Sequence, residues 1–138
     1  MDPQQRLALI AFAEAWAAVQ GRPGPAGVYV GTSQLEYARM TCEARMHAAS
    51  PYYATGAHLS VASGRIAYAF NLRGPAMTID TACSSSLVAA ACGWAAIQRA
   101  DVGAAGVLGV NLCLVPSWTF VCHQVTCAAR SDGASCWQ

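Results

Sequence analysis

The sequence predicts an α/β fold in which a mostly parallel sheet is covered by helices. β-prone stretches alternate along the chain with apolar stretches of helical character, which is the order of parallel strands joined by crossover helices. The clearest junction lies at Cys83, where a β-prone run at 76–80 stops just before it and a small-residue helical run at 87–91 starts just after it. No internal repeat, linker or low-complexity segment divides the 138 residues, so we expect a single domain.

The first helix is predicted to begin at the N-terminus. Asp2 is expected to be its N-cap, with Pro3 in the first turn and Gln5 as the capping-box partner. Gly21 and Pro23 are expected to end it. Its apolar residues recur at helical spacing and should form one buried face, made of Leu9, Phe12, Ala13, Trp16 and Val19.

The other predicted elements follow in order, each bounded by glycine, proline or a turn. They are a strand at 28–31, a helix at 41–49 ended by Ser50 and Pro51, a helix at 59–70, a strand at 76–80 after a turn at 73–75, a helix at 84–99, and a β-rich run at 107–114 closed by Pro116.

Composition fits part of a globular cytosolic enzyme. Hydrophobic residues make up 55% of the chain and charged residues only 11%, against about 25% charged in typical globular domains. So few charges cannot coat the surface, and we expect an apolar face to be covered by further sequence or by a partner. A net charge of +1 gives no electrostatic reason to expect nucleic-acid or membrane binding.

Neither a signal peptide nor a membrane span is predicted. The apolar run at 7–13 fits a signal peptide poorly, because Asp2 offsets Arg6 before it and Glu14 interrupts the stretch after it. The longest apolar candidate, at 102–115, is interrupted by Asn111 and is shorter than the ~18 residues that a transmembrane helix needs.

The seven cysteines indicate neither a disulfide framework nor a metal site. Their number is odd, no secretory signal precedes them and no Cys-x-x-Cys pair occurs. The nearest approach to a ligand cluster is Cys122 and Cys127 with His123, and its spacing fits no common zinc pattern. We therefore expect reduced thiols in a cytosolic setting and no metal.

Cys83 is the candidate for covalent chemistry. The strand-to-helix order puts its thiol on a tight turn at a helix N-terminus, where exposed N–H groups and the helix dipole favour a thiolate. The turn would also lift the sulfur clear of the sheet, as the nucleophile elbow does for a serine in hydrolases. Taken alone, the pattern also allows Cys83 to be a small buried hydrophobe. The serines at 84–86 could supply the nucleophile instead, but more simply they cap the first turn of the helix.

The wider context resembles a known family. The stretch at 60–87, which reads SVASGRIAYAFNLRGPAMTIDTACSSSL, closely resembles the active-site region of β-ketoacyl synthases, above all the ketosynthase domains of modular polyketide synthases and animal-type fatty acid synthases. The segments 1–6, 27–31 and 109–112 are also similar to that family, and Ser131-Asp132-Gly133 is so more loosely. The resemblance implies a thiolase-like fold, with residues 1–138 as a partial β-ketoacyl synthase N-terminal domain, an incomplete first half of the family's two-fold repeat.

The resemblance also implies a reaction. By analogy with the family, Cys83 takes an acyl group as a thioester from the phosphopantetheine arm of an acyl carrier protein, and a decarboxylated malonyl-type extender then attacks that thioester. The product belongs to polyketide or fatty acid biosynthesis. The oxyanion hole would include the backbone N–H of Cys83. The family implies no cofactor bound directly, a homodimer and a cytoplasmic location.

Several family features are missing from this sequence. The family keeps histidines in His-Gly-Thr-Gly-Thr and Asn-x-Gly-His motifs and a lysine, whereas this chain has no lysine, and His47, His58 and His123 stand in none of those contexts. We therefore expect the 138-residue chain alone not to condense acyl groups. The run Gly106-Val107-Leu108-Gly109 replaces the usual Gly-Gly pair, and the sequence after Trp118 diverges.

Two other function classes fit some of these features. One is a non-catalytic ketosynthase-like interaction subunit or remnant, although such subunits usually replace the nucleophile. The other is a cysteine hydrolase with water as the acyl acceptor, which needs a histidine within hydrogen-bond reach of Cys83.

Overall fold

A three-stranded parallel sheet forms the centre of the molecule, with the strands in the order β2-β1-β3. The computed structural model describes residues 1–19, 25–33, 35–44, 51–116 and 119–124. The strands are β1 (Ala26–Gly31), β2 (Ala76–Ile79) and β3 (Ala104–Gly109). Both pairings are parallel, and Val28 lies opposite Ala76 on one side and Gly106 on the other. The predicted α/β fold with a parallel sheet is thus confirmed.

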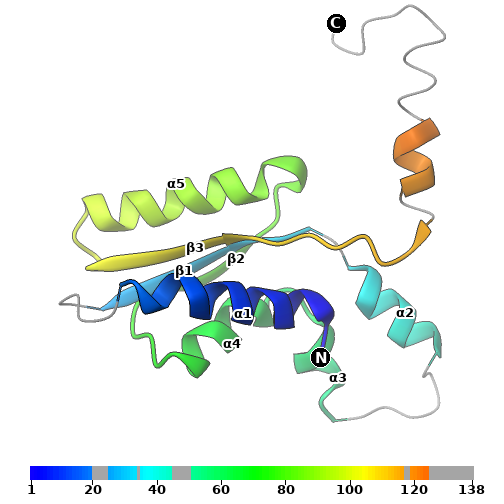
Figure 1. Ribbon diagram of the computed structural model, residues 1–138, viewed down its shortest axis with the longest axis horizontal. Coiled ribbons are helices and arrows are strands. Elements are labelled where there is room, and N and C mark those ends of the chain that lie inside the picture. Colours follow the sequence, from blue (N-terminus) through cyan, green and yellow to red (C-terminus); the bar gives the residue numbers. More distant parts are fainter. Residues whose placement is uncertain (20–24, 34, 45–50, 117–118, 125–138) are drawn as a thin grey trace, which may run out of the picture.

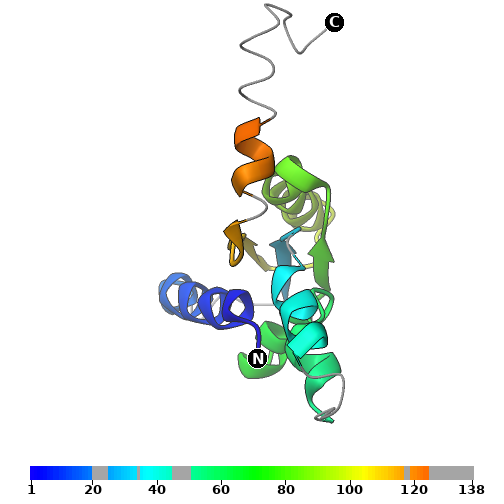
Figure 2. The same cartoon turned by 90° about the vertical axis from the view of Figure 1, so that its right-hand side faces the viewer.

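Helices cover both faces of the sheet (Figure 1). Helices α1 (Pro3–Ala17) and α4 (Val61–Ala69) lie on one face, and α5 (Ser85–Gln98) lies on the other. Figure 2 shows the sheet between α5 on one side and α1 on the other. The helices α2 (Glu36–Ala44) and α3 (Tyr53–Ala57) follow the carboxyl end of β1 in sequence.

The central strand β1 is buried on both of its faces. Val28 and Val30 are fully buried in a cluster with Phe12 of α1 and Ile66 of α4. Tyr29 points the other way and packs with alanines of α5. Because successive side chains of a strand point to opposite faces, each helix layer meets its own set of β1 side chains. Burial raises the pKa of the Tyr29 phenol above its ordinary value, while Arg99 lowers it and Asp101 adds to the rise.

At the start of α1, the predicted N-cap is confirmed, whereas the partner predicted for Gln5 is not. Asp2 is the N-cap, and its Oδ1 accepts a hydrogen bond of 2.8 Å from the Gln4 N–H. The predicted capping box is wrong, because the Gln5 amide donates instead to the carbonyl of His58 at 3.1 Å and its Oε1 accepts from Arg65 at 2.9 Å. The Asp2 N–H is paired with the Gly56 carbonyl at 2.6 Å.

Several other element predictions need correction. In α1, Phe12 is buried but Ala13 is exposed, and the predicted stops at Gly21 and Pro23 lie outside the described residues. Helix α2 begins at Glu36 rather than at residue 41, and α3 was not predicted. The helices α4 and α5 and the strand β2 match their predictions within a few residues.

The last strand is shifted from its predicted position at 107–114. β3 runs over Ala104–Gly109 because its partner β1 ends at Gly31, and Val110 makes the last backbone bond to that residue, at 3.0 Å. On the other side of β1, the Thr32 N–H bonds the Ile79 carbonyl at 3.0 Å, which is the last bond of the β1–β2 pairing. Both pairings of β1 therefore end at the same level. No helix among the described residues has the length and apolar character needed to cross a membrane.

Candidate active site

Cys83 lies on the turn between β2 and α5, as the sequence predicts for it. The turn is a short 3₁₀ segment, η1 (Ala82–Ser84), which leads directly into α5. The Cys83 side chain is exposed, so the alternative of a small buried hydrophobe is wrong. The preceding residue, Ala82, has a φ of 54°, a left-handed conformation that costs a residue with a Cβ about 1–2 kcal/mol. A strained residue thus stands directly before the thiol.

Side chains from both ends of the turn hold this conformation. Asp80 Oδ1 accepts the Ala82 N–H at 3.0 Å. Ser85 Oγ accepts the Thr81 N–H at 2.9 Å and donates to the Ala82 carbonyl at 2.7 Å. The strained residue is therefore bonded through both its N–H and its carbonyl.

The side chains of Ser84 and Ser85 bond groups of the turn rather than capping the helix. Ser84 is the N-cap of α5 but its side chain makes no capping bond. Its Oγ donates backward, to the Thr81 carbonyl and to Thr81 Oγ1, both at 2.9 Å. The prediction that these serines cap the first turn of the helix is thus wrong for Ser84 and Ser85.

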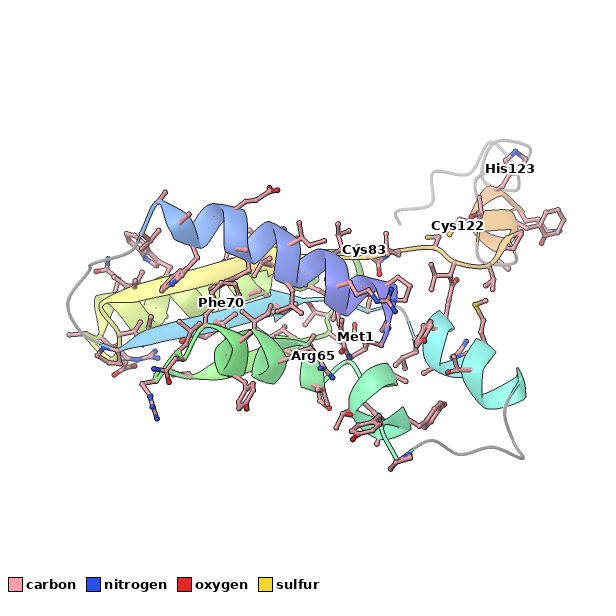
Figure 3. All side chains as sticks on the ribbon, turned by 60° about the horizontal axis from the view of Figure 1, so that its bottom comes forward. Met1, Arg65, Phe70, Cys83, Cys122 and His123 are labelled. Carbon is pink, nitrogen blue, oxygen red and sulfur yellow. The ribbon has the colours of Figure 1, made fainter. Side chains whose placement is uncertain are left out.

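A cavity of about 250 Å³ opens beside the thiol, where the carboxyl ends of the strands meet. It is lined by residues 31–33 at the end of β1, by residues 82, 83, 85 and 86 of the turn and α5, and by residues 109–111 at the end of β3. Open parallel sheets bind their ligands at this edge. Figure 3 shows Cys83 near this end of the sheet, apart from His123 on the helical segment 119–124.

Two glycines let α5 start against the sheet edge. A Cβ on Gly31 would lie 2.5 Å from the backbone of Ser85 and Ser86, and a Cβ on Gly109 would lie 2.7 Å from the Cβ of Ser86. A Cβ atom essentially never comes this close to a heavy atom to which it is not bonded. Any larger residue at either position would push the first turn of α5, and with it the thiol, away from the strand ends.

The cavity contains neither a histidine nor a lysine among its lining residues. His58 and His123 are exposed elsewhere, and His47 lies outside the described residues. Within the described ranges, no cluster of three or more His, Cys, Asp or Glu residues could hold a metal ion. What the arrangement offers is one exposed thiol at a helix start, facing a small cavity.

Comparison with known proteins assigns this geometry to a family. The family model described as "Beta-ketoacyl synthase, N-terminal domain" matches residues 1–136. The chain belongs to the β-ketoacyl synthase family. The predicted resemblance to the N-terminal domain of polyketide ketosynthases is thereby confirmed, as is a partial thiolase-like fold.

Similar β-ketoacyl synthases come from bacterial polyketide synthases. The chain is 42% identical over 121 residues to polyketide synthase ThaG of Burkholderia thailandensis, covering 84% of this chain and 2% of that protein. It is 43% identical over 140 residues to pikromycin polyketide synthase component PikAII of Streptomyces venezuelae, covering 98% and 4%. A solved ketosynthase from module 6 of the bacillaene synthase of Bacillus subtilis superposes with a TM-score of 0.71 at 34% identity. The alignment covers 90% of this chain and 21% of that one.

Some lining residues of this β-ketoacyl synthase segment were not identified from the sequence. Thr32 and Ser33 were not singled out, although polar residues that follow a buried strand are a signal for a site at the sheet edge. Asn111 was not singled out either; it lies beyond the end of β3, is exposed and lines the cavity.

Proposed function

We propose that this chain forms part of a β-ketoacyl-[acyl carrier protein] synthase in which Cys83 accepts the acyl group. The observation that carries the proposal is the exposed Cys83 thiol at the start of α5, beside a cavity at the carboxyl edge of the sheet. The thiolate is the nucleophilic form of cysteine. Membership in the β-ketoacyl synthase family supports the reaction class.

In the first step, the Cys83 thiolate attacks the carbonyl carbon of an acyl thioester carried on the phosphopantetheine arm of an acyl carrier protein. The new C–S bond forms to Cys83 as the bond to the phosphopantetheine sulfur breaks, and that sulfur leaves as a thiolate. Negative charge develops on the carbonyl oxygen during the attack. The backbone N–H of Cys83, at the helix start, is the proposed donor to that oxygen.

In the second step, a malonyl-type extender loses carbon dioxide, and the resulting carbanion attacks the acyl-Cys83 carbonyl. The C–S bond to Cys83 breaks, the thiolate is regenerated, and the acyl chain is longer by two carbons. The resemblance assigns this step to histidine and lysine motifs that the present sequence does not contain. Residues 1–138 are therefore proposed as the acyl-accepting part of one ketosynthase domain, within a homodimer.

A cysteine hydrolase is less well supported, because none of the described residues that line the Cys83 cavity is a histidine. A non-catalytic interaction subunit is less well supported because the thiol is present and exposed.

Acyl transfer to Cys83 tests the proposal. The protein is incubated with an acyl phosphopantetheine thioester, digested and analysed by mass spectrometry for the acyl mass on each cysteine peptide. We expect the acyl group on the Cys83 peptide, its loss in Cys83→Ala, and full retention in Cys122→Ala, which removes another exposed thiol. Equal acylation of Cys83, Cys113 and Cys122 would show that the Cys83 thiol is not activated, and the proposal would fail.

A further inference from the structure

After β3, the backbone N–H groups change from a strand partner to side-chain partners. The Val110 N–H still bonds β1, at the Gly31 carbonyl, at 3.0 Å. The Leu112 N–H then bonds Oε1 of Gln4 at 3.1 Å. Side chains thus replace the missing strand partner from residue 112 onward.

Glu36 supplies the acceptor for the next backbone N–H groups of this segment. Its Oε2 accepts hydrogen bonds from the N–H groups of Leu114 and Val115, the latter at 3.0 Å. Hydrogen bonds to an ionised carboxylate are roughly twice as strong as those between neutral groups. Both Gln4 and Glu36 are buried, at 2% and 6% exposure, although their side chains are polar. They come from distant parts of the chain and hold the same segment.

The held segment continues directly from one wall of the Cys83 cavity. Val110 and Asn111 line that cavity, and the held residues begin next to them, at Leu112. Gln4 Oε1 also accepts from the hydroxyl of Thr32 at 3.4 Å, and Thr32 lines the same cavity. Gln4 therefore bonds one lining residue, Thr32, and the residue that follows Asn111.

We propose that Gln4 and Glu36 are positioning residues: by holding the backbone at 112–115 they fix the cavity wall formed by Val110 and Asn111, and thereby set the size of the group that reaches the thiol. This inference rests on the proposed function for its acyl substrate. Neither residue touches the reacting atoms. Each acts through the backbone that continues from the wall.

Gln5 provides a matched control for Gln4. The two residues are neighbours on α1, both are buried glutamines, and both bond through their side chains. The Gln5 side chain, however, bonds the Thr55 and His58 carbonyls and Arg65, none of which lines the cavity. If the variants acted only by destabilising the fold, Gln4→Met and Gln5→Met should therefore change the reactivity of the Cys83 thiol alike.

The experiment compares two alkylating reagents of different size on the Cys83 thiol. Rate constants for iodoacetamide and N-hexyl iodoacetamide are measured at the Cys83 peptide by mass spectrometry, in the parent chain and in each variant. We expect the ratio of the two constants to change at least threefold in Gln4→Met and Glu36→Met. It should stay unchanged in Gln5→Met and return toward the parent value in Gln4→Glu, which keeps the acceptor oxygen.

Amide hydrogen exchange gives a second measurement. We expect the Leu112 N–H to exchange at least tenfold faster in Gln4→Met, and the Leu114 N–H to do so in Glu36→Met. Should Gln4→Met lose its helical circular dichroism, Gln4→Asn takes its place, because it keeps the amide and withdraws the acceptor. An unchanged reagent ratio in folded variants, or an equal change in Gln5→Met, would overturn the inference.

The outcome separates this inference from the proposed function, because alkylation needs no acyl transfer. A shifted ratio in a protein that takes no acyl group from a thioester would leave the wall assignment standing and refute the acyl-accepting role. Acylation of Cys83 with an unchanged ratio of the two rate constants would support the acyl-accepting role and refute the wall assignment.

Discussion

Ala82, the residue before the thiol, has a positive φ without being a glycine. Its N–H bonds Asp80 and its carbonyl bonds Ser85, so the conformation is fixed by bonds on both sides. Strain of this kind costs of the order of 1–3 kcal/mol and persists only where the surroundings impose it. Here it directs the chain from β2 into α5 within a single short turn.

A β-branched side chain at this position tests the strain. We expect Ala82→Val to lower the free energy of unfolding by about 1–3 kcal/mol, because valine tolerates a positive φ less well than alanine. Urea denaturation followed by circular dichroism measures the loss. Ala76→Val is the control: it lies exposed in β2, where valine is favoured, and should change stability little. Equal losses in the two variants would contradict a special conformation at Ala82.

Tyr29 gives a residue-scale prediction of pH dependence. Its pKa in the folded chain is raised by burial, so the folded state keeps the phenol proton more tightly than the unfolded state does. The stabilisation that the neutral Tyr29 phenol contributes is therefore complete below the unfolded-state pKa of about 10. It is lost as the pH rises through the folded-state pKa. We expect Tyr29→Phe to lose less stability than the parent chain between pH 8 and pH 11.

The control for this prediction is Tyr68→Phe, because Tyr68 is 90% exposed whereas Tyr29 is 2% exposed. The urea midpoints of both variants and of the parent are compared at the two pH values. Tyr68→Phe should follow the parent. If Tyr29→Phe lost as much stability at alkaline pH as the parent does, the assignment of the pH dependence to the buried phenol would be contradicted.

At the scale of elements, the close contact of α5 with the strand ends depends on Gly31. An added Cβ would lie 2.5 Å from the α5 backbone, which cannot give way as a flexible side chain can. We expect Gly31→Ala to destabilise the fold by about 1–3 kcal/mol or more and to slow alkylation of Cys83, because the start of α5 must move. Both effects are measurable on one preparation, by urea denaturation and by the rate with iodoacetamide.

Gly64 on α4 provides the matched control for Gly31. Nothing lies within 4 Å of the Cβ it would carry, and it is exposed within a helix. Gly64→Ala should therefore stabilise the chain by about 0.5–1 kcal/mol through helix propensity and leave the Cys83 rate unchanged. A stability gain in Gly31→Ala would show that the contact with α5 is not tight.

The elements that could be predicted from the sequence are those whose causes are local. Asp2 and Pro3 start α1 through contacts within their own turn, and the β2-turn-α5 junction is likewise contiguous. The start of α2 and the end of β3 could not be placed, since Glu36 is bonded to residues 114–115 and β3 ends where its distant partner β1 ends. The Cys83 cavity has walls from three separate segments, of which only the one around Cys83 was identified as a site from the sequence.

At the scale of the whole molecule, a composition poor in charge is matched by large apolar side chains exposed on α5. Hydrophobic residues are 55% and charged residues 11% of the sequence, and the outer face of α5 exposes Leu87 at 72% and Trp94 at 65%. These two residues are seven positions apart and so share one helix face. The sheet-facing side of α5 is buried, at Ala89 and Ala96. The composition-based expectation of an apolar face in need of cover is met on α5.

This face predicts self-association of the isolated chain. We expect the sedimentation coefficient of the parent to rise with protein concentration, because copies bury the α5 face against one another. The double variant Leu87→Gln, Trp94→Gln should sediment as a monomer over the same range. Tyr68→Gln, which removes an exposed aromatic ring from α4 on the other side of the sheet, should associate as the parent does. Concentration-dependent sedimentation that persists in the double variant would place the contact on another surface and leave the α5 face free for another segment of the ketosynthase.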